Sequence, residues 1–310
     1  MAPSPLFEKP CDRNAQRRPQ PVTVPNALVV GANGGMGLSV TRALVNACYR
    51  VGATVSRPEA VPAFRKDCPG CAIVEVADLA DADLLKAQVE RLVDFMGSLD
   101  AVVICAAVAP FAPAETTSFD VFRRTMEINC LSNLAVYQAC LPALRKTHGR
   151  IILTGSWSGV VATPVMASYV ASKFALEGLA DVLRQEAGAW NVDVVLIQPG
   201  SLDTQMMRRS QASLAQVISE LPDEEAALYG NLYRQMKYRA DEGLTNANYT
   251  SPNAVAEIVV EALRAENPGT RYQVGMDAEY MCQIARTKSD REIDSLILDL
   301  YRTAPLESGS

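Results

Sequence analysis

Two residues four positions apart carry the clearest chemical signal in the chain. The segment Tyr169-Val170-Ala171-Ser172-Lys173 puts a phenol and an ammonium at i and i+4, which makes them neighbours on one helix face. A nearby ammonium favours the phenolate over the phenol, and free tyrosine has a pKa of about 10. The pair predicts a tyrosine that exchanges protons near neutral pH, although a Y-x-x-x-K spacing alone is common in helices.

A serine and an asparagine precede this pair. Ser156 lies 13 residues before Tyr169 in the turn Gly155-Ser156-Trp157-Ser158-Gly159. This turn directly follows a predicted strand, so the hydroxyl of Ser156 can face the same site. Asn129 ends an apolar stretch of the preceding predicted helix. For Asn129, a role in the site and a hydrogen bond inside the helix are equally good explanations.

The first predicted strand runs directly into a glycine-rich turn, Gly31-Ala32-Asn33-Gly34-Gly35-Met36-Gly37. Residues without a Cβ let backbone amides approach a pyrophosphate at a helix N-terminus. The spacing is G-x-x-x-G-x-G rather than G-x-G-x-x-G, because Asn33 stands where the second glycine would be. The turn predicts a dinucleotide site, and the alternative is a β-to-α turn without a ligand. The contacts expected here are Gly31, Asn33, Gly34, Gly35, Met36 and Gly37.

The end of the second predicted strand favours NADP(H) over NAD(H). A free ribose 2′-hydroxyl is normally bound by an Asp or Glu about 20 residues after the first glycine. No acidic residue occurs between Gly31 and Pro58. Ser56 and Arg57 would instead receive a 2′-phosphate through a hydroxyl and a guanidinium. The alternative for Arg57 is an ordinary surface arginine.

Alternating strands and helices must position these residues. From Ala27 onward, short β-branched runs alternate with longer segments of helical period, as in repeated βαβ units around a parallel sheet. We expect one doubly wound α/β domain of the Rossmann type over 26–275, with a helical C-terminal extension over 276–310. Strands are predicted at 27–30, 51–55, 72–76, 101–105, 151–154, 193–197 and 271–274, and helices near 36–48, 81–97, 117–146, 167–189 and 252–265.

The stretch over about 204–237 is predicted to form helices at the carboxyl edge of the sheet, where open α/β folds bind ligands. Its apolar residues recur at three- or four-residue spacing, which makes a stripe on a helix, and methionines suit a pocket for bulky apolar molecules. Trp157 and Val161 would line the opposite wall. A stripe that only packs on the domain is the alternative. The stripe consists of Met206, Met207, Leu214, Ile218, Leu221, Leu228, Tyr229, Leu232, Tyr233 and Met236.

Composition excludes several classes of protein. Of the 310 residues, 49% are apolar and 21% charged, which excludes collagen-like and disordered chains. Lys plus Arg is 29 against 35 for Asp plus Glu, and the resulting charge of −6 argues against nucleic acid as a partner. The apolar stretch 101–114 contains two prolines and is too short for a membrane span. Eight cysteines, mostly inside apolar runs, indicate a reducing compartment, and we expect the cytoplasm.

Three local features point away from further chemistry. Residues 1–25 carry six prolines and mixed charge, which predicts a flexible tail without a signal peptide. Cys68-Pro69-Gly70-Cys71 is a single C-x-x-C, so a plain turn is preferred to a redox-sensitive pair. The only histidine, His148, lies in a predicted helix-end loop, and we expect no metal site.

Together these motifs resemble the classical branch of the short-chain dehydrogenase/reductase family, over roughly Ala27 to Gly275. The segment Pro199-Gly200-Ser201-Leu202-Asp203-Thr204 matches the segment that closes over the nicotinamide, and Asp78 with Leu79 matches the adenine contact. The matching catalytic tetrad is Asn129, Ser156, Tyr169 and Lys173, and the resemblance implies cofactor contacts from Gly31, Gly35, Gly37, Asp78, Leu79, Ala106, Tyr169, Lys173, Pro199, Gly200 and Thr204.

The resemblance implies hydride transfer at C4 of the nicotinamide. Tyr169 would donate the proton in reduction or accept it in oxidation, and Ser156 would hydrogen-bond the substrate oxygen. Lys173 would hold the nicotinamide ribose and tune Tyr169, while Asn129 would anchor a water in the proton relay.

Two positions depart from the family pattern. Val30 replaces the threonine usually found before the first glycine, and Ile104-Cys105-Ala106-Ala107 replaces Asn-Asn-Ala-Gly after the fourth strand. In the family, the side chains replaced here brace the turn and the adenine pocket. We therefore expect these departures to affect cofactor affinity more than chemistry.

The order of elements from Pro199 to Gly275 resembles hydroxysteroid and retinol dehydrogenase-like members of the family. It implies a seven-stranded sheet of order 3-2-1-4-5-6-7 and a homodimer or homotetramer through the helices at 117–146 and 167–189. We expect an NADP(H)-dependent oxidoreductase that interconverts a bulky apolar ketone, of steroid, polyketide or aromatic type, and its secondary alcohol. A non-catalytic NADP-sensing regulator is the alternative. An epimerase or dehydratase of the extended branch fits less well, because its glycine spacing and larger C-terminal domain are missing.

Overall fold

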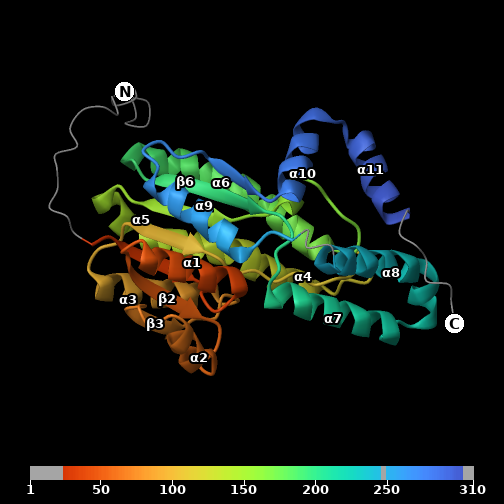
Figure 1. Cartoon of the computed structure of the whole chain (residues 1–310), viewed down its shortest axis with the longest axis horizontal. Coiled ribbons are helices and arrows are strands. Elements are labelled where there is room, and N and C mark those ends of the chain that lie inside the picture. Colours follow the sequence, from red (N-terminus) through yellow and green to blue (C-terminus); the bar gives the residue numbers. More distant parts are fainter. Residues whose placement is uncertain (1–23, 246–248, 303–310) are drawn as a thin grey trace, which may run out of the picture.

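A seven-stranded parallel sheet forms the centre of the molecule in a computed structural model that describes residues 24–245 and 249–302 (Figure 1). The order β3-β2-β1-β4-β5-β6-β7 confirms the predicted fold class and topology. The expected tail, 1–25, lies outside the described residues except at its last two positions. The strands are β1 (Asn26–Val30), β2 (Arg50–Val55), β3 (Ile73–Val76), β4 (Ala101–Ile104), β5 (Arg150–Thr154), β6 (Asp193–Pro199) and β7 (Arg271–Val274).

Helices cover both faces of the sheet. On one face lie α1 (Gly35–Asn46), α2 (Ala60–Asp67) and α9 (Pro252–Arg264), and on the other lie α3 (Ala82–Met96), α5 (Ser132–Thr147) and α6 (Ala167–Ala187). The pattern did not predict α2, because this short helix buries a single side chain, Phe64. The other helices on the two faces lie within the predicted segments or differ from them by a few residues at their ends.

The strand residues alternate between two cores, one under each helix layer. On β1, Leu28 belongs to the cluster under α3, α5 and α6, and Val29 belongs to the cluster under α1, α2 and α9. Both side chains are fully buried, and such burial stabilises the fold by about 1.5–3 kcal/mol for each residue. Burial on both faces explains why the strands are continuous apolar runs.

The predicted helix over 117–146 is continuous but contains a wider turn. Its parts are α4 (Phe119–Met126), the π-helical turn η2 (Glu127–Leu131) and α5. The side chain of Ser118 caps α4 by accepting a hydrogen bond from the N–H of Val121, 3.3 Å away. The π turn contains Asn129, and such turns occur often at functional sites.

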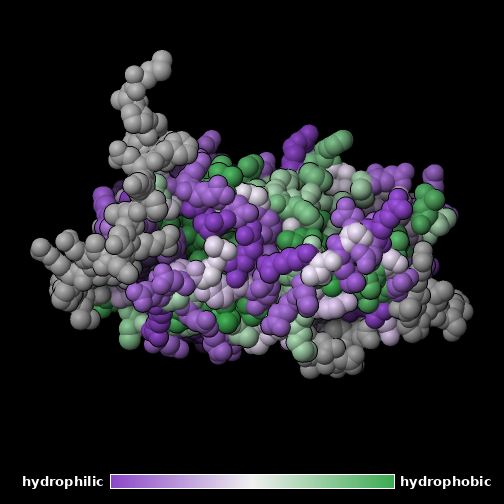
Figure 2. All heavy atoms as spheres, turned by 90° about the horizontal axis from the view of Figure 1, so that it is seen from above, coloured by the Kyte–Doolittle hydropathy of each residue, from purple (hydrophilic) through white to green (hydrophobic). Residues whose placement is uncertain are grey.

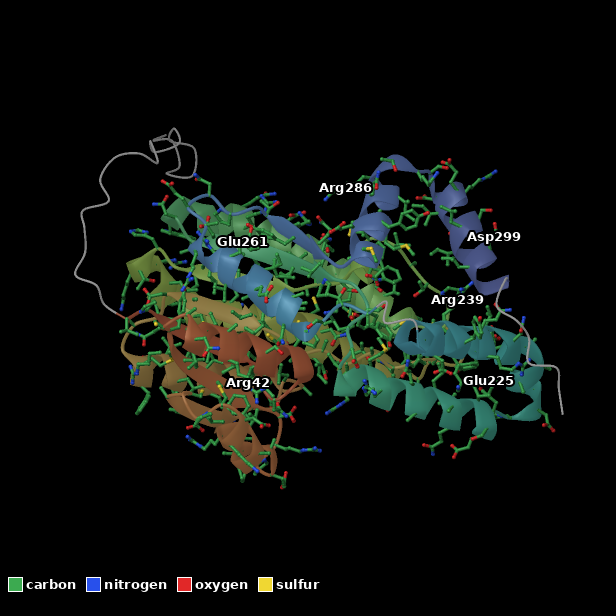
Figure 3. All side chains as sticks on the ribbon, viewed as in Figure 1. Arg42, Glu225, Arg239, Glu261, Arg286 and Asp299 are labelled. Atoms are coloured by element: carbon green, nitrogen blue, oxygen red, sulfur yellow. The ribbon has the colours of Figure 1, made fainter. Side chains whose placement is uncertain are left out.

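Two pairs of helices stand beyond the carboxyl edge of the sheet: α7 (Gln205–Glu220) with α8 (Asp223–Thr245), and α10 (Met276–Thr287) with α11 (Asp290–Arg302) (Figure 1). The apolar stripe packs here in a third cluster with Trp157, Val161, α10 and α11. Within the stripe, Leu228 is 64% exposed, and the side chain of Met206 lies outside the described part. Arg239 on α8 donates to the carbonyl oxygen of Leu300, the residue that follows Asp299 on α11. Arg239 and Asp299 are labelled in Figure 3.

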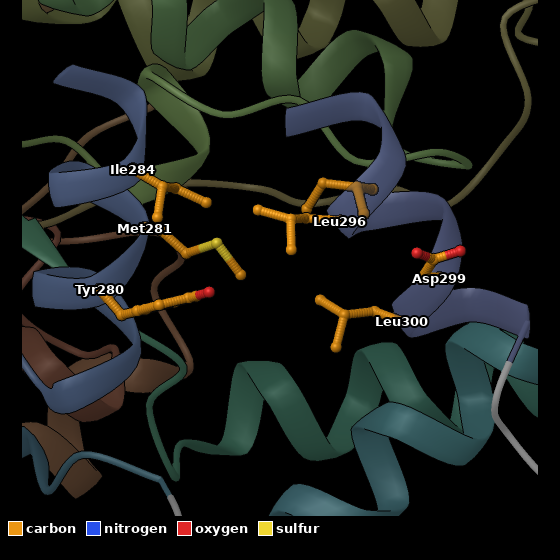
Figure 4. Close-up of a pocket in the computed structure, with 7 residues that line it drawn as sticks. Tyr280, Met281, Ile284, Leu296, Asp299 and Leu300 are labelled. Atoms are coloured by element: carbon orange, nitrogen blue, oxygen red, sulfur yellow. The ribbon is translucent and has the colours of Figure 1, made fainter. Parts of the chain in front are cut away.

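A small apolar cavity of about 230 Å³ separates α10 from α11 (Figure 4). It is lined by Tyr280, Met281, Ile284, Leu296, Ile297, Asp299 and Leu300. On the face seen in Figure 2, hydrophilic and hydrophobic residues are mixed. Among the helices of the described ranges, none has both the length and the apolar composition that a membrane crossing requires.

The turn after β1 is held by the neighbouring strand β2. Gly31 has φ +80°, a backbone conformation that favours glycine, and its N–H donates to Thr54 Oγ1 over 3.0 Å. The N–H of Ala32 donates to the carbonyl oxygen of Thr54 over 2.8 Å. Thr54 is fully buried, and its hydroxyl supplies the acceptor that the buried N–H of Gly31 would otherwise lack.

We predict that Thr54→Val destabilises the protein by about 1–3 kcal/mol, because a side chain of similar shape leaves the buried N–H of Gly31 without an acceptor. Urea unfolding followed by circular dichroism measures the change. Thr41→Val is the matched control, because the Thr41 hydroxyl is equally buried but only donates to the helix carbonyl of Gly37. Equal losses in the two variants would contradict the assigned role of Thr54.

Candidate active site

The phenol and the ammonium meet near the N-terminus of α6, as the spacing predicted. Lys173 Nζ lies 5.8 Å from the centre of the Tyr169 ring. The same Nζ donates to the carbonyl oxygen of Thr154, at the end of β5, over 2.8 Å. Since Lys173 is only 1% exposed, this carbonyl provides part of the solvation that its ammonium loses by burial.

Ser156 comes to the same place from the turn after β5. Its Oγ accepts a hydrogen bond from the N–H of Ser158 over 3.1 Å, so the short helix η3 (Trp157–Gly159) begins there. The Ser156 side chain is close enough to the Tyr169 phenol to lower its pKa by hydrogen bonding to the phenolate. The Ser156 hydroxyl and the Tyr169 phenol therefore lie near each other at the carboxyl edge of the sheet.

Burial raises the pKa of Tyr169 above its ordinary value of 10, and the hydrogen bond with Ser156 only partly opposes this. The sequence led us to expect the opposite direction, with Lys173 lowering the pKa of the phenol. Desolvation of the buried phenolate is the larger effect here. At neutral pH the Tyr169 hydroxyl therefore keeps its proton and is suited to donate it.

Burial also lowers the pKa of Lys173 to about 8, because the interior disfavours the ammonium. The nearby Cys130 and Glu177 partly oppose this shift and favour the charged form. Lysine is charged below its pKa, so Lys173 carries a proton at pH 7 and loses it as the pH rises through about 8. An ammonium whose pKa lies this close to neutral pH can donate its proton to a neighbouring group.

Asn129 uses its side chain to connect elements. Its Oδ1 accepts from the N–H of Val108, and its Nδ2 donates to the carbonyl oxygen of Val108, both over 2.8 Å. Nδ2 also donates to Ser172 Oγ over 2.9 Å, and Ser172 lies between Tyr169 and Lys173 on α6. None of these side-chain bonds is the helix-interior bond that the sequence left open as the alternative, because they join the loop after β4 to α6.

The glycine turn is shaped by contacts that leave no room for side chains. A Cβ on Gly37 would lie 2.3 Å from the carbonyl oxygen of Gly31, and one on Gly31 would lie 2.6 Å from Ala106 Cβ. A Cβ on Gly35 would lie 3.1 Å from Thr204. Gly34 precedes α1 without a side-chain cap, so the first N–H groups of this helix are left for an anion.

The end of β2 lies beside this turn. Asn33 Nδ2 donates to Ser56 Oγ, and the N–H of Ser56 donates to Asn33 Oδ1, both over 3.1 Å. Arg57 is exposed next to Ser56, and within the described part of the chain it forms no ion pair. Asn33, Ser56 and Arg57, three of the residues expected to bind the nucleotide, are thus adjacent to one another and accessible.

The remaining cofactor candidates surround the same edge of the sheet. Asp78 is exposed, and its Oδ1 accepts from the N–H of Ala80 over 3.0 Å. The Leu79 side chain is instead buried in the core under α3, which leaves only 7% of it exposed. Met36 is likewise buried, against the opposite core.

The segment 199–204 is fixed by contacts that the sequence did not indicate. The N–H of Gly200 donates to the carbonyl oxygen of Val274 over 2.9 Å, and the N–H of Ser201 donates to Asp277 Oδ2 over 2.7 Å. Thr204 caps α7 by accepting from the N–H of Met207 over 3.2 Å. Of these contacts, only the close approach of Gly200 to Asp277 had a signal in the sequence, namely the glycine after Pro199. The role of Thr54 also had only a weak signal, a single threonine in an apolar strand.

The two cysteines of the C-x-x-C segment and the single histidine, for which the sequence indicated no chemical role, pack as ordinary structural residues. Cys68 and Cys71 are buried free thiols, and burial raises the pKa of Cys71 to about 11. His148 ends α5 in the left-handed conformation, with Nδ1 3.0 Å from the carbonyl oxygen of Trp190. The described residues contain no group of three or more His, Cys, Asp or Glu that would hold a metal ion.

A cavity of about 550 Å³ opens beside the N-terminus of α6. The loop after β4, the segment leading to Tyr169 and α8 provide its walls, which are mainly apolar. It is lined by Pro113, Ala114, Glu115, Thr163, Pro164, Val165, Ala167, Tyr229 and Leu232. Tyr229 and Leu232 belong to the predicted stripe, so part of the stripe faces a cavity.

Comparison with known proteins agrees with this geometry. The reductase for 3-amino-tetrahydro-pyrrolizinone from Xenorhabdus hominickii is 26% identical over 279 residues, which are 88% of this chain and 94% of the reductase. Estradiol 17-beta-dehydrogenase 1 from Rattus norvegicus is 26% identical over 254 residues, 79% of this chain and 72% of the dehydrogenase. A crystal structure of a short-chain dehydrogenase from Streptomyces avermitilis superposes with a TM-score of 0.69 at 20% identity, covering 91% of this chain and 97% of that chain.

The sequence profile of the short chain dehydrogenases matches residues 25–215. This match covers more than half of the chain, including the glycine turn and the pair Tyr169 and Lys173. The similarity to the rat estradiol dehydrogenase agrees with the hydroxysteroid-like order of elements. The chain therefore belongs to the short-chain dehydrogenase family, oxidoreductases that use a nicotinamide cofactor, as its motifs predicted.

Proposed function

We propose that this oxidoreductase uses NADP(H) to interconvert a bulky, largely apolar ketone and its secondary alcohol. The observation that carries the proposal is the cluster of Tyr169, Ser156 and Lys173, in which a protonated phenol lies beside a serine hydroxyl and a buried ammonium. A carbonyl oxygen between the two hydroxyls would receive hydrogen bonds from both.

The glycine turn fits a dinucleotide. The tight contacts of Gly31 and Gly37 allow backbone N–H groups to approach a pyrophosphate, and the start of α1 has no side-chain cap that would compete with it. When bound, the cofactor supplies or accepts a hydride at C4 of its nicotinamide. The segment 199–204 would lie over the nicotinamide, because Thr204 stands beside the glycine turn, 3.1 Å from where a Cβ on Gly35 would be.

Tyr169 transfers the proton in the proposed reaction. In reduction the carbonyl carbon gains a hydride with its electron pair, and the carbonyl oxygen takes the proton of Tyr169. Ser156 stabilises the charge that develops on this oxygen by donating a hydrogen bond. Lys173, whose pKa is about 8, then returns a proton toward the phenolate and would also hold the nicotinamide ribose.

The preference for NADP(H) is supported by the end of β2. Ser56 and Arg57 are exposed beside the turn, and the pairing of Asn33 with Ser56 keeps this hydroxyl in place. A guanidinium and a hydroxyl suit a 2′-phosphate, whereas a ribose 2′-hydroxyl calls for a carboxylate that this strand lacks.

The substrate class is supported by the cavity and by the stripe. The cavity of about 550 Å³ is large enough for a polycyclic or aromatic ketone, and its walls are mostly apolar. The relative from rat is named for estradiol, a bulky apolar molecule of this kind. Sugars and small hydroxy acids would leave these walls in contact with water.

We further propose a homo-oligomer and a reducing compartment. Phe119, Leu131, Phe174 and Val182 expose 45–81% of their surface on α4, η2 and α6, where the family resemblance suggests contact between subunits. The buried free thiols suit a cytoplasmic protein.

Replacement of Tyr169 by phenylalanine removes the transferred proton and keeps the ring. We expect turnover of ketones with NADPH to fall by about 10²–10⁴-fold, and NADPH binding, measured by its fluorescence, to be retained. Tyr280→Phe, at an exposed position on α10, is the control and should leave turnover unchanged. Turnover close to that of the wild type in Tyr169→Phe would refute the role of Tyr169, and binding without any turnover in the wild type would favour a regulator.

Replacement of Arg57 by alanine tests the choice of nucleotide. The dissociation constant of NADPH should rise about 10- to 100-fold while that of NADH changes little, because only NADPH has the 2′-phosphate. Arg65 is also exposed but lies on α2, and Arg65→Ala should change neither dissociation constant. Val55→Asp should shift the preference toward NADH. Faster turnover by the wild type with NADH than with NADPH at equal concentration would contradict the proposal.

The substrate class is tested by kcat/KM values across matched ketones. Bulky apolar ketones should exceed small polar ones by about tenfold or more, since a buried methylene group contributes about 0.8 kcal/mol. Leu232→Asp places a charge in the cavity wall and should lower kcat/KM for the bulky ketones alone. Leu228→Asp, one turn away and exposed, is the control. A preference for small polar ketones would mean that the stripe serves only packing.

A further inference from the structure

A buried carboxylate lies one helical turn beyond Lys173. Glu177 is only 8% exposed, and residues at i and i+4 on a helix are neighbours. A carboxylate is buried at a considerable cost in free energy unless hydrogen bonds and an opposite charge compensate it. The reaction proposed above does not use this group, so its presence beside Lys173 needs an explanation.

Both oxygens of Glu177 are hydrogen-bonded. Oε1 accepts from Gln198 Nε2 over 2.7 Å, and Oε2 accepts from Arg271 Nε over 2.9 Å. Gln198 is in β6 and Arg271 in β7, so two strands fix one carboxylate on α6. Arg271 also pairs with Asp181, one turn further along α6, over 3.0 Å.

The glycine that ends η3 allows this arrangement. A Cβ on Gly159 would lie 2.9 Å from Glu177 Cγ and 2.9 Å from the carbonyl oxygen of Lys173. The turn that starts at Ser156 therefore packs directly against the α6 segment from Lys173 to Glu177. Any larger residue at position 159 would push the carboxylate away from the site.

The surroundings of Lys173 contain one carboxylate. Its neighbours are the Cys130 thiol from η2, the Tyr169 phenol and Glu177 from α6, and the Thr154 carbonyl oxygen from β5. Burial raises the pKa of Cys130 and that of Tyr169, so neither is an anion at neutral pH. An ionised Cys130 would also favour the ammonium, but Glu177 is the one carboxylate among these neighbours.

We propose that Glu177 is a positioning residue that keeps Lys173 charged in the buried site, with Gln198 and Arg271 holding its carboxylate in place. This inference rests on the proposed function only in assigning Lys173 a role in proton transfer. The effect of Glu177 on the charge of Lys173 does not depend on it. The alternative is that Glu177 serves only the ion pair with Arg271. Asp181 separates the two, because it binds the same guanidinium but lies a further turn from Lys173.

Competitive acetylation with acetic anhydride tests the proposal on the full chain without cofactor. Acetylation requires the neutral amine, so the pH dependence of Lys173 labelling, read by mass spectrometry of its peptide, gives the midpoint of its titration. In the wild type we expect a midpoint near 8. In Glu177→Gln it should fall by about half a pH unit or more, because a group that favours the ammonium is lost. In Asp181→Asn it should stay in place.

An unchanged midpoint in folded Glu177→Gln, or an equal fall in Asp181→Asn, would overturn the proposal. If Glu177→Gln does not fold, the double variant Glu177→Gln/Arg271→Gln replaces both partners by amides and is compared with Arg271→Gln alone; the double variant should show the lower midpoint. The alkaline limb of kcat should move in the same direction as the midpoint. Because labelling needs no turnover, an inactive wild type would refute the proposed function and leave this result intact.

Discussion

The burial of one ammonium group governs the arrangement of the site. Lys173 is almost fully enclosed, so its charge depends on the carbonyl oxygen of Thr154 at the end of β5 and on the charge of Glu177. A group solvated by so few partners must be held accurately, since each lost hydrogen bond leaves a buried charge uncompensated. The rigid elements around it supply this accuracy, because β5 and α6 form part of the core and η3 packs against α6.

The parallel sheet explains why distant residues meet. All strands run in one direction, so the turns that follow β1, β2, β4, β5 and β6 lie at one edge. The glycine turn, Ser56, the loop bound by Asn129, Ser156 and the segment 199–204 each follow one of these strands. Hydrogen bonds between turns then complete the edge. Thr54 supports the turn after β1, and Asp277 supports the turn after β6 from the other side.

The two departures from the family pattern fit this account. Val30 lacks a hydroxyl, but Thr54 on the adjacent strand offers one to the N–H of Gly31. Ala106 has no polar side chain, and its methyl group instead packs where a Cβ on Gly31 would lie. Backbone bonds such as that from the N–H of Cys105 to the carbonyl oxygen of Val30, 2.9 Å long, keep the two turns together. The turn is thus braced by different residues in the same place.

Local patterns in the sequence were sufficient for the strands, most helices, the glycine turn and the pairing of Tyr169 with Lys173, because each depends on residues close in the chain. Apolar periodicity reports burial, and an i, i+4 spacing reports a shared helix face. Tertiary structure alone decided the direction of the pKa shift of Tyr169, the bonds of Asn129 to Val108, and the partners of Glu177. Burial and contacts between residues such as Glu177 and Arg271, 94 positions apart, arise only when the chain folds, and no local pattern encodes them.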